Sequence, residues 1–212
     1  MSFQDVSLGV FLARAASDAP TPGGGALAAV GGALGAAMIA MTARLTLGRP
    51  RYAAVQDAAA ALAEQADRAW RALLALADAD ADAYERVMAA LRLPRATDAE
   101  RAARQSALQQ ALVSATQVPA AIAEQCQAVL ALAETAAAIT NRNALGDVAT
   151  GALLAEAGMR AAAVQAELNL AGIEDAAFVE RMAAALAPQA AGAAERLERI
   201  LATVRQRAAE RV

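Results

Sequence analysis

The chain has 212 residues, of which 58% are hydrophobic but only 3% aromatic, and its formal net charge is −3. Every basic residue is an arginine, and histidine is absent. The charge argues against a broad nucleic-acid-binding surface. The lack of histidine beside a single cysteine, Cys126, excludes the usual zinc sites, an intrachain disulfide and Ser-His or Cys-His catalysis. Proton chemistry must therefore use carboxylates, tyrosine, backbone groups or water.

The composition predicts an all-α protein, since most of the apolar content is alanine, the best helix former, and strand-like alternation is nearly absent. We expect one domain, residues 1–212, built as a bundle of about six helices, several of them long. Helix-breaking residues place the first three helices at residues 4–17, 26–47 and 52–92. The fourth helix starts at the capping box of residues 97–100 and is expected to kink at Pro119. The fifth helix runs from Asn143, which can cap it, to about residue 170, and the sixth starts at "IEDAAF" and runs through Pro188 to the end.

Residues 26–43 carry no charge and are long enough for a short membrane span, which Arg44 would close. The stretch is only weakly hydrophobic because it is rich in Ala and Gly, and no second candidate exists. A helix buried in a bundle explains it better. The early Asp5 and the lack of a basic start argue against a signal peptide, so we expect a cytoplasmic protein with no membrane partner.

The glycine-rich stretch "TPGGGALAA" contains Pro22, Gly23, Gly24 and Gly25. It lacks the lysine and hydroxyl residue of a nucleotide-binding P-loop, and no strand precedes it. Glycines let a ligand or another backbone approach closely, and a helix that starts here offers free N–H groups to an anion or a carbonyl. Tight helix packing is an equally good explanation of this segment alone.

The acidic run "ALADADADAYERVMAAL" singles out Asp80. Its neighbours at helical spacing are apolar or aromatic: Leu73, Leu76, Ala77, Tyr84 and Val87. Asp82, in contrast, shares its face with charged residues. Burial raises the pKa of a carboxylate, which suits a general acid or base near neutral pH. The alternative is a structural aspartate that holds an arginine or a helix end.

A second pattern lies on the fifth predicted helix. Small and polar residues recur there near helical spacing: Asp147, Gly151, Leu154, Gly158, Ala162, Gln165 and Asn169. Such a stripe suits a narrow cleft for a flat, polar ligand. Two of these residues also have simpler explanations. Acids such as Asp147 are favoured in a first helical turn, and Asn169 can cap a carbonyl near the helix end.

Taken together, five segments resemble one family: "FLARAASDAPTPGGGALAA", "LTLGRPRY", "DADAYERVMAALRLPR", "ATQVPAA" and "NALGDVATGALLAEAGMRAAAVQAELNL". They look like the formimidoyltetrahydrofolate cyclodeaminase and methenyltetrahydrofolate cyclohydrolase family, in the same order, from about residue 3 to 180. None of the segments is specific by itself, but their combination in this order is specific for the family.

The resemblance implies an all-helical homodimer that binds a folate-type small molecule, with no nucleic acid, no metal and no cofactor beyond the tetrahydrofolate substrate. Asp80 matches the family's proposed proton acceptor. Asp147 would hold the pterin edge, and Arg49 or Arg51 would meet the glutamate tail. The full set of substrate-binding residues that we expect is Pro22, Gly23, Gly24, Gly25, Arg49, Arg51, Tyr84, Asn143, Asp147, Gln165 and Asn169.

The chain departs from the family pattern at several positions. Arg49, Pro50 and Arg51 replace a lysine cluster, and arginine cannot act as a titrating amine. Arg44 and Gln165 stand where asparagines are usual, Gly146 stands where a serine is usual, and Thr140 replaces a glycine. Two hypotheses therefore follow: a folate one-carbon enzyme, or a catalytically altered relative that binds folate or another small ligand as a helical dimer. No formiminotransferase domain accompanies the chain, which favours a free-standing cyclohydrolase over a cyclodeaminase.

Overall fold

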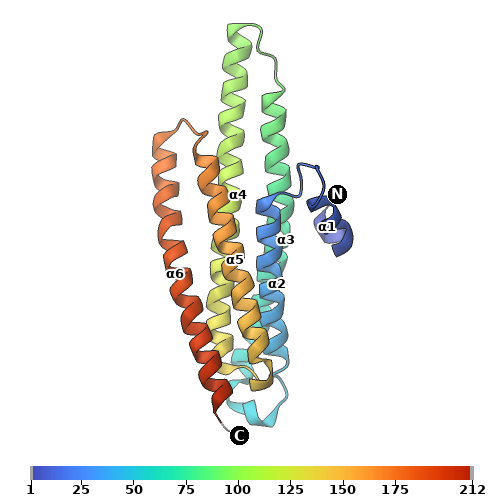
Figure 1. Cartoon of the computed structure of the whole chain (residues 1–212), viewed down its shortest axis with the longest axis vertical. Coiled ribbons are helices and arrows are strands. Elements are labelled where there is room, and N and C mark those ends of the chain that lie inside the picture. The colour runs from blue at the N-terminus through green and yellow to red at the C-terminus, as the bar shows by residue number, and fades with distance from the viewer. Residues whose placement is uncertain (1, 211–212) are drawn as a thin grey trace.

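The computed structural model describes residues 2–210, without the side chains of residues 188–191. Within these residues every regular element is helical, so the predicted all-α class is confirmed (Figure 1). The α-helices are α1 (Leu8–Ala15), α2 (Gly24–Arg44), α3 (Gln56–Leu91), α4 (Asp98–Ile139), α5 (Leu145–Leu170) and α6 (Ala176–Ala209), and the short 3-10 helices are η1 (Phe3–Asp5), η2 (Pro50–Val55) and η3 (Arg142–Ala144).

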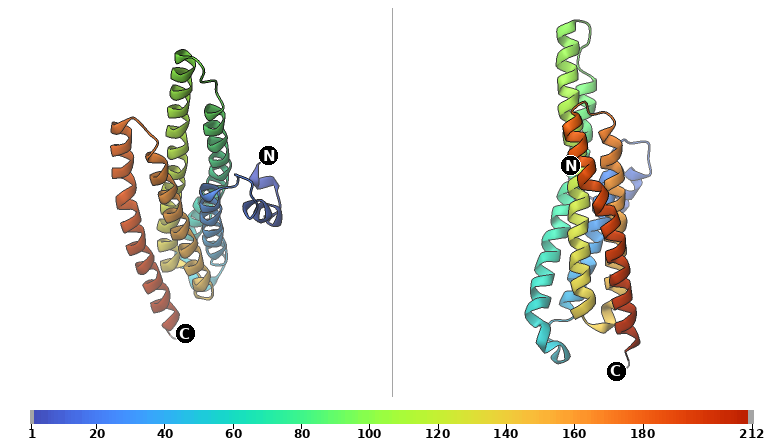
Figure 2. Two further views of the ribbon diagram at one scale, coloured as in Figure 1. Left: turned by 45° about the horizontal axis from the view of Figure 1, so that its top comes forward. Right: turned by 90° about the vertical axis from the view of Figure 1, so that its left-hand side faces the viewer.

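The five long helices form an elongated bundle in which α2 packs against both α3 and α5 (Figure 1). Helix α4 packs against α3 and α5, and α6 covers the side formed by α4 and α5. The end of α3 and the start of α4 extend beyond the other helices as a two-helix arm, whereas α1 stands off the side of the bundle (Figure 2).

Small residues let α2 approach its neighbours closely. A Cβ atom on Gly35 would lie 2.6 Å from the Gly151 carbonyl oxygen, and one on Gly158 would lie 2.7 Å from the Ala28 carbonyl oxygen. These contacts pack α5 directly onto α2. Helix α2 is apolar and long enough to cross a membrane, but its most apolar window is 61% buried inside the bundle, so most of it packs against the other helices.

Three helix starts differ from the sequence-based expectation. Helix α1 begins only after Ser7, whose hydroxyl accepts from the Val10 N–H. Helix α2 begins inside the glycine run, at Gly24. The prediction that Asn143 caps the fifth helix is wrong: the Asn141 side chain accepts from the Asn143 N–H at 3.1 Å and caps η3, which leads into α5.

Other local predictions are confirmed. The Thr97 hydroxyl accepts from the Glu100 N–H while Glu100 accepts from the Thr97 N–H, which completes the capping box of α4. Helix α4 continues through Pro119 as one element, and the kink expected at this residue stays a prediction. Asp175 caps α6 by accepting from the Phe178 N–H at 3.0 Å.

One exposed apolar surface runs along α2 and α5, which we call the α2/α5 face. It consists of side chains that are 37–67% exposed: Leu27, Leu34, Met41, Leu45, Leu153, Val164 and Leu168. A row of exposed large apolar side chains is typical of a contact with another protein surface.

Candidate active site

A cavity of about 280 Å³ lies at the start of α2, where α2, α3, α4 and α5 meet. We call it the Asp80 pocket. It is lined by Pro20, Thr21, Gly23, Gly24, Gly25, Asp80, Ala83, Tyr84, Val87, Leu112, Ala115, Gln165 and Asn169. The structure thus brings together Asp80, the three glycines, Tyr84, Gln165 and Asn169.

Asp80 reaches across from α3 to the first turn of α2. Its Oδ2 accepts from the Ala26 N–H at 2.9 Å. This approach requires a glycine at position 25, because a Cβ atom there would lie 2.1 Å from Asp80 Oδ1. The glycine run therefore opens the helix start to a carboxylate of the same chain as well as to the cavity.

Two influences set the protonation of Asp80. Partial burial raises its pKa above the usual value, because a low-polarity environment disfavours the charged form, and the hydrogen bond from the Ala26 N–H opposes that shift. The burial effect is the larger one. A half-buried carboxylate with a raised pKa can accept a proton from a bound group and return it.

Gln165 forms the wall of the pocket beside Gly24. A Cβ atom on Gly24 would lie 2.7 Å from Gln165 Nε2, so the side chain packs directly against the helix start. The N–H groups of Gly24 and Gly25 belong to the first turn of α2 and have no carbonyl partner within the helix. They offer donors to a ligand in the pocket.

Asn169 is held by the neighbouring helix. Its Nδ2 donates to the Ala115 carbonyl oxygen at 2.7 Å. This carbonyl lies four residues before Pro119, which has no N–H to complete the regular helical bond. Asn169 thus satisfies a carbonyl of α4, and not one at the end of its own helix.

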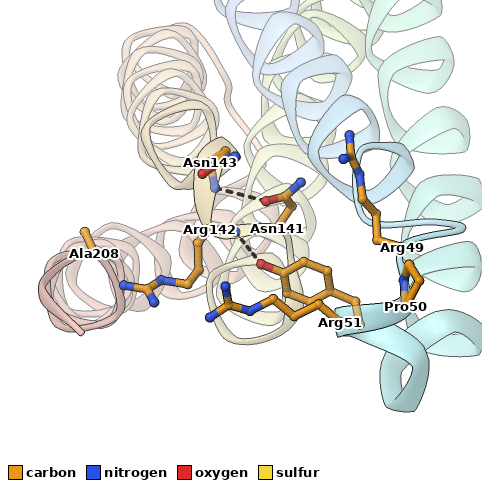
Figure 3. Close-up of a pocket in the computed structure, with 8 residues that line it drawn as sticks. Arg49, Pro50, Arg51, Asn141, Arg142, Asn143 and Ala208 are labelled. Atoms are coloured by element: carbon orange, nitrogen blue, oxygen red, sulfur yellow. Dashed lines mark hydrogen bonds between the residues drawn. The ribbon is translucent and has the colours of Figure 1, made fainter. Parts of the chain in front are cut away.

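Arg49, Arg51 and Asn143 lie at the opposite end of the bundle, around a second cavity of about 430 Å³ (Figure 3). We call it the arginine pocket. Its lining is Arg49, Pro50, Arg51, Tyr52, Asn141, Arg142, Asn143 and Ala208. Pro22 lies between Thr21 and Gly23 beside the Asp80 pocket without lining it, and Asp147 lines neither cavity. The Tyr52 hydroxyl accepts from the Arg142 N–H at 3.0 Å, which fastens η2 to η3. None of the ion pairs formed within residues 2–210 involves Arg49 or Arg51.

Asp147 does not line the Asp80 pocket of its own chain, and its expected role in substrate binding stays a prediction. Asp147 lies in the first turn of α5, whereas Gln165 lies 18 residues further along the same helix, or about 27 Å at the rise of an α-helix. Between them, Gly151 and Gly158 pack on α2. The small-residue stripe is a helix–helix contact over most of its length, and it reaches a cavity only at Gln165 and Asn169.

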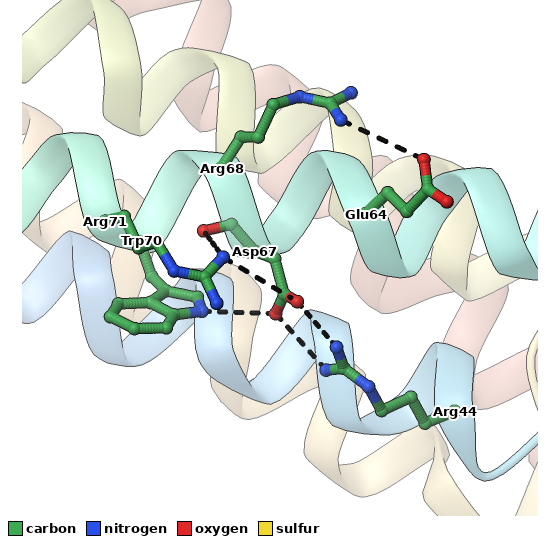
Figure 4. Close-up of polar contacts among 6 residues, drawn as sticks. All are labelled: Arg44, Glu64, Asp67, Arg68, Trp70 and Arg71. Carbon is green, nitrogen blue, oxygen red and sulfur yellow. Dashed lines mark hydrogen bonds and ion pairs between the residues drawn. The ribbon is translucent and has the colours of Figure 1, made fainter.

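Arg44, one of the departures from the family pattern, is also far from Asp80. It pairs with Asp67 at 2.6 Å, and Asp67 also accepts from the Trp70 ring N–H at 3.2 Å (Figure 4). The Arg71 guanidinium lies 4.4 Å from the centre of the Trp70 ring. Arg44 thus stabilises the contact between the end of α2 and α3, outside the Asp80 pocket.

Sequence reasoning missed several pocket residues. Leu112 and Ala115 come from α4, and Pro20 and Thr21 precede the glycines. Pro119 was the available signal for α4, because a proline inside a helix leaves a carbonyl that needs a donor from elsewhere. Over residues 2–210, no three His, Cys, Asp or Glu side chains gather as metal ligands would.

Comparisons with known proteins agree with this architecture. Residues 7–188 match the family described as Formiminotransferase-cyclodeaminase. The chain is 40% identical to methenyltetrahydrofolate cyclohydrolase of Methylorubrum extorquens over 93% of this chain and 95% of that protein. It is 32% identical to rat formimidoyltransferase-cyclodeaminase, of which it spans 33%.

A solved structure has the same fold. The crystal structure of formiminotetrahydrofolate cyclodeaminase from Thermotoga maritima superimposes with a TM-score of 0.86 at 28% identity, over 96% of this chain and 98% of that one. The match extends over the whole bundle, including the helices that form both pockets. The chain belongs to the formiminotransferase-cyclodeaminase family.

Proposed function

We propose that the protein is a methenyltetrahydrofolate cyclohydrolase, a folate one-carbon enzyme in which Asp80 acts as the general base. The observation that carries this proposal is the half-buried Asp80 carboxylate, bound to the N-terminus of α2 in a pocket shared by four helices. The cyclohydrolase activity is favoured over cyclodeamination because the cyclohydrolase relative aligns over nearly its full length at higher identity.

The reaction needs a base and a water molecule. The methenyl carbon is electrophilic because it belongs to a cationic amidinium. A water oxygen bonds to this carbon while Asp80 accepts one water proton, which gives a neutral carbinolamine. One carbon–nitrogen bond then breaks, the hydroxyl proton moves to the departing nitrogen, and a formyl group stays on the other nitrogen. Asp80 releases its proton to solvent, so one proton is produced overall.

The Asp80 charge also favours binding of the substrate, because an ionised carboxylate attracts the cationic amidinium in a pocket of low polarity. The N–H groups of Gly24 and Gly25 and the Gln165 side chain would donate to or accept from the polar edge of the ring. Tyr84 and Val87 would pack on its face. No metal and no cofactor beyond the folate substrate is needed.

We further propose that the protein is a cytoplasmic homodimer that forms through the α2/α5 face. Seven large apolar side chains on this face are at least 37% exposed, and α2 contributes no charged residue between Gly24 and Ala43. Most symmetric oligomers are two-fold dimers, in which one surface patch contacts its own copy. Nothing in this proposal requires a nucleic acid or a membrane.

The test is loss of the methenyl chromophore, followed by absorbance with purified protein. We expect Asp80→Asn to lower kcat by about 10²–10⁴-fold, the usual contribution of a general base. Asp82→Asn is the matched control, because Asp82 lies on the same helix, is exposed, and lines no part of the Asp80 pocket. Unchanged turnover in Asp80→Asn would remove this residue from the mechanism. Turnover of formimino- but not methenyl-tetrahydrofolate would identify a cyclodeaminase instead.

A further inference from the structure

We propose that Asp78 is a positioning residue for the reaction. It fastens the start of the chain to α3 and so holds residues 2–23, which we call the N-terminal strap, against the Asp80 pocket. The attached strap sets how tightly the pocket holds its substrate, whereas Asp80 remains the base. This inference rests on the proposed function.

Two aspartates of the acidic run bind the two ends of the strap. The Asp78 carboxylate accepts from the Ser2 hydroxyl and, at 2.7 Å, from the Phe3 N–H. Two residues further along α3, Asp80 accepts from the Ala26 N–H, just beyond the other end of the strap. Between these points the chain leaves the bundle, forms α1 and returns (Figure 2). One short stretch of α3 therefore closes a loop of more than one helix.

The strap has little apolar contact with the bundle along α1. Phe11 is the only buried residue of this helix, and its ring packs edge-on against the Phe3 ring, with 5.2 Å between the centres. The other large apolar side chains of α1 are 50–61% exposed: Leu8, Val10 and Leu12. Hydrogen bonds to a charged group are stronger than those between neutral groups. The two bonds to Asp78 are therefore a main attachment of the strap.

The far end of the strap forms a wall of the Asp80 pocket. Pro20, Thr21 and Gly23 line this cavity together with Asp80. Gly23 is also the N-cap of α2, so the strap sets where the free N–H groups of that helix begin. Release of the strap loosens this wall but leaves the hydrogen bond between Asp80 and the Ala26 N–H. Substrate binding is then weakened while the base stays in place.

The experiment compares Asp78→Ala with Asp82→Ala in the full chain. Asp78 and Asp82 lie two residues before and two residues after Asp80, so each substitution removes one negative charge equally far along the helix. Both aspartates line a small cavity beside Ser2 and Phe3, and of the two it is Asp78 that accepts hydrogen bonds from the strap. The comparison separates the attachment from the effect of a lost charge.

We expect Asp78→Ala to raise KM for methenyltetrahydrofolate by about tenfold relative to Asp82→Ala, as the loss of a hydrogen bond to a charged group does. The value of kcat should stay within about twofold, because the contact that is lost serves binding and not the chemical step. The pH midpoint of kcat/KM should be the same in both variants. A merely destabilised protein would instead lose kcat through a smaller active fraction, at unchanged KM.

A cross-link between the two ends of the attachment provides the rescue. Ser2→Cys/Asp78→Cys removes the hydrogen bonds, and a short bis-maleimide reagent then joins the two introduced thiols. The native Cys126 is buried and does not compete for the reagent. KM should be raised before cross-linking and return toward the wild-type value afterwards. Equal KM values in Asp78→Ala and Asp82→Ala would overturn the proposal, as would a raised KM that the cross-link does not restore.

The strap can also be followed without any substrate, by hydrogen exchange and mass spectrometry. The returning segment, residues 17–21, contains two hydrogen-bonded amides, those of Ser17 and Ala19. Exchange in Asp78→Ala should be faster than in Asp82→Ala both at Phe3 and in this segment. Faster exchange at Phe3 alone would show that the attachment does not reach the pocket wall, and would overturn the proposal.

A failure of the proposed function is distinguishable. If the wild-type protein turns over neither folate substrate, the dissociation constant of tetrahydrofolate, from calorimetric titration, replaces KM in the same comparison. Weaker binding in Asp78→Ala together with faster exchange at both places would retain the strap as the wall of a folate site and reject only the reaction. Equal binding in the two variants would reject the strap.

Discussion

Two effects act in opposite directions on the pKa of Asp80. Partial burial raises it by favouring the neutral form, and the hydrogen bond from the Ala26 N–H lowers it by favouring the carboxylate. Because burial prevails, the pKa of Asp80 in the folded protein exceeds its value in the unfolded chain. The folded state therefore binds this proton more tightly. Its contribution to stability is present below the unfolded-state pKa and is lost as the pH rises through the folded-state pKa.

Because of this linkage, the stability of the protein depends on the charge state of Asp80. Asp80→Asn removes the titration while its side-chain oxygen can still accept from the Ala26 N–H. We expect the variant to gain stability relative to the wild type as the pH rises from the ordinary aspartate range toward neutrality. Urea unfolding at a series of pH values measures the difference. A constant difference across the series would contradict a raised pKa for Asp80.

The same shift predicts the pH dependence of turnover. A general base must be ionised, so kcat/KM of the wild-type protein should rise with pH through the pKa of Asp80. The midpoint should lie above about 3.9, the ordinary aspartate value. Asp82→Asn should keep this profile. A profile that is flat over the stable acidic range would show that no such base limits the reaction.

Gly25 positions Asp80 by having no side chain. Gly25→Ala would place a Cβ atom 2.1 Å from Asp80 Oδ1, so the carboxylate would have to leave the Ala26 N–H. We expect a loss of kcat comparable to that of Asp80→Asn, with the fold retained in circular dichroism. Gly9→Ala is the matched control, because a Cβ atom at that helical position meets nothing within 4 Å. Wild-type turnover in Gly25→Ala would show that this hydrogen bond is dispensable.

At the scale of elements, α4 and α5 are joined by the amide of Asn169 and the carbonyl that Pro119 leaves free. Asn169→Ala should destabilise the protein by about 1 kcal/mol, the typical value of an intramolecular hydrogen bond. In a Pro119→Ala background the helix can supply its own N–H to the Ala115 carbonyl, and the same substitution should cost less. A double-mutant cycle by chemical denaturation measures this coupling. Equal costs in both backgrounds would show that the two residues act independently.

Helix positions could be predicted from the sequence wherever the signal was local. The capping box at Thr97 depends only on residues three positions apart, and the start of α6 was predicted within "IEDAAF". The apolar spacing around Asp80 likewise predicted which aspartate of the acidic run would face inward. These features follow from helical geometry, which is already contained in the order of residues.

Predictions failed where distant segments compete for the same group. Asn141 forms the cap, and not Asn143, because Asn141 is held by two distant residues. Its backbone N–H donates to the Thr46 hydroxyl, 95 residues away, and its side-chain amide donates to the Leu45 carbonyl oxygen, 96 residues away. The stripe on α5 had the spacing of a cleft, but α2 fills the space beside Gly151 and Gly158. Periodicity identifies a helix face and does not say whether a ligand or another helix covers it.

At the scale of the whole molecule, the proposed dimer contact lies on the α2/α5 face. Leu34→Asp places a charge on this face between Leu27 and Met41, where it would be buried against the partner in the proposed dimer. We expect a monomer in sedimentation measurements. Leu93→Asp is the control, because Leu93 is 40% exposed but follows α3 on the two-helix arm, away from this face. A dimeric Leu34→Asp variant would move the interface elsewhere.

The sulfur of Cys126 lies at the centre of the bundle, where it would be 2.4 Å from a Cβ atom on Gly32 and 3.2 Å from one on Gly158. Burial raises its pKa to about 12, so the native thiol is neither accessible nor ionised at neutral pH. Since the sequence holds no other cysteine, thiol-specific reagents should label the protein only when the whole bundle opens. The rate of that labelling then reports global opening directly, and a cysteine engineered onto the surface can carry a fluorescent dye without any background reaction.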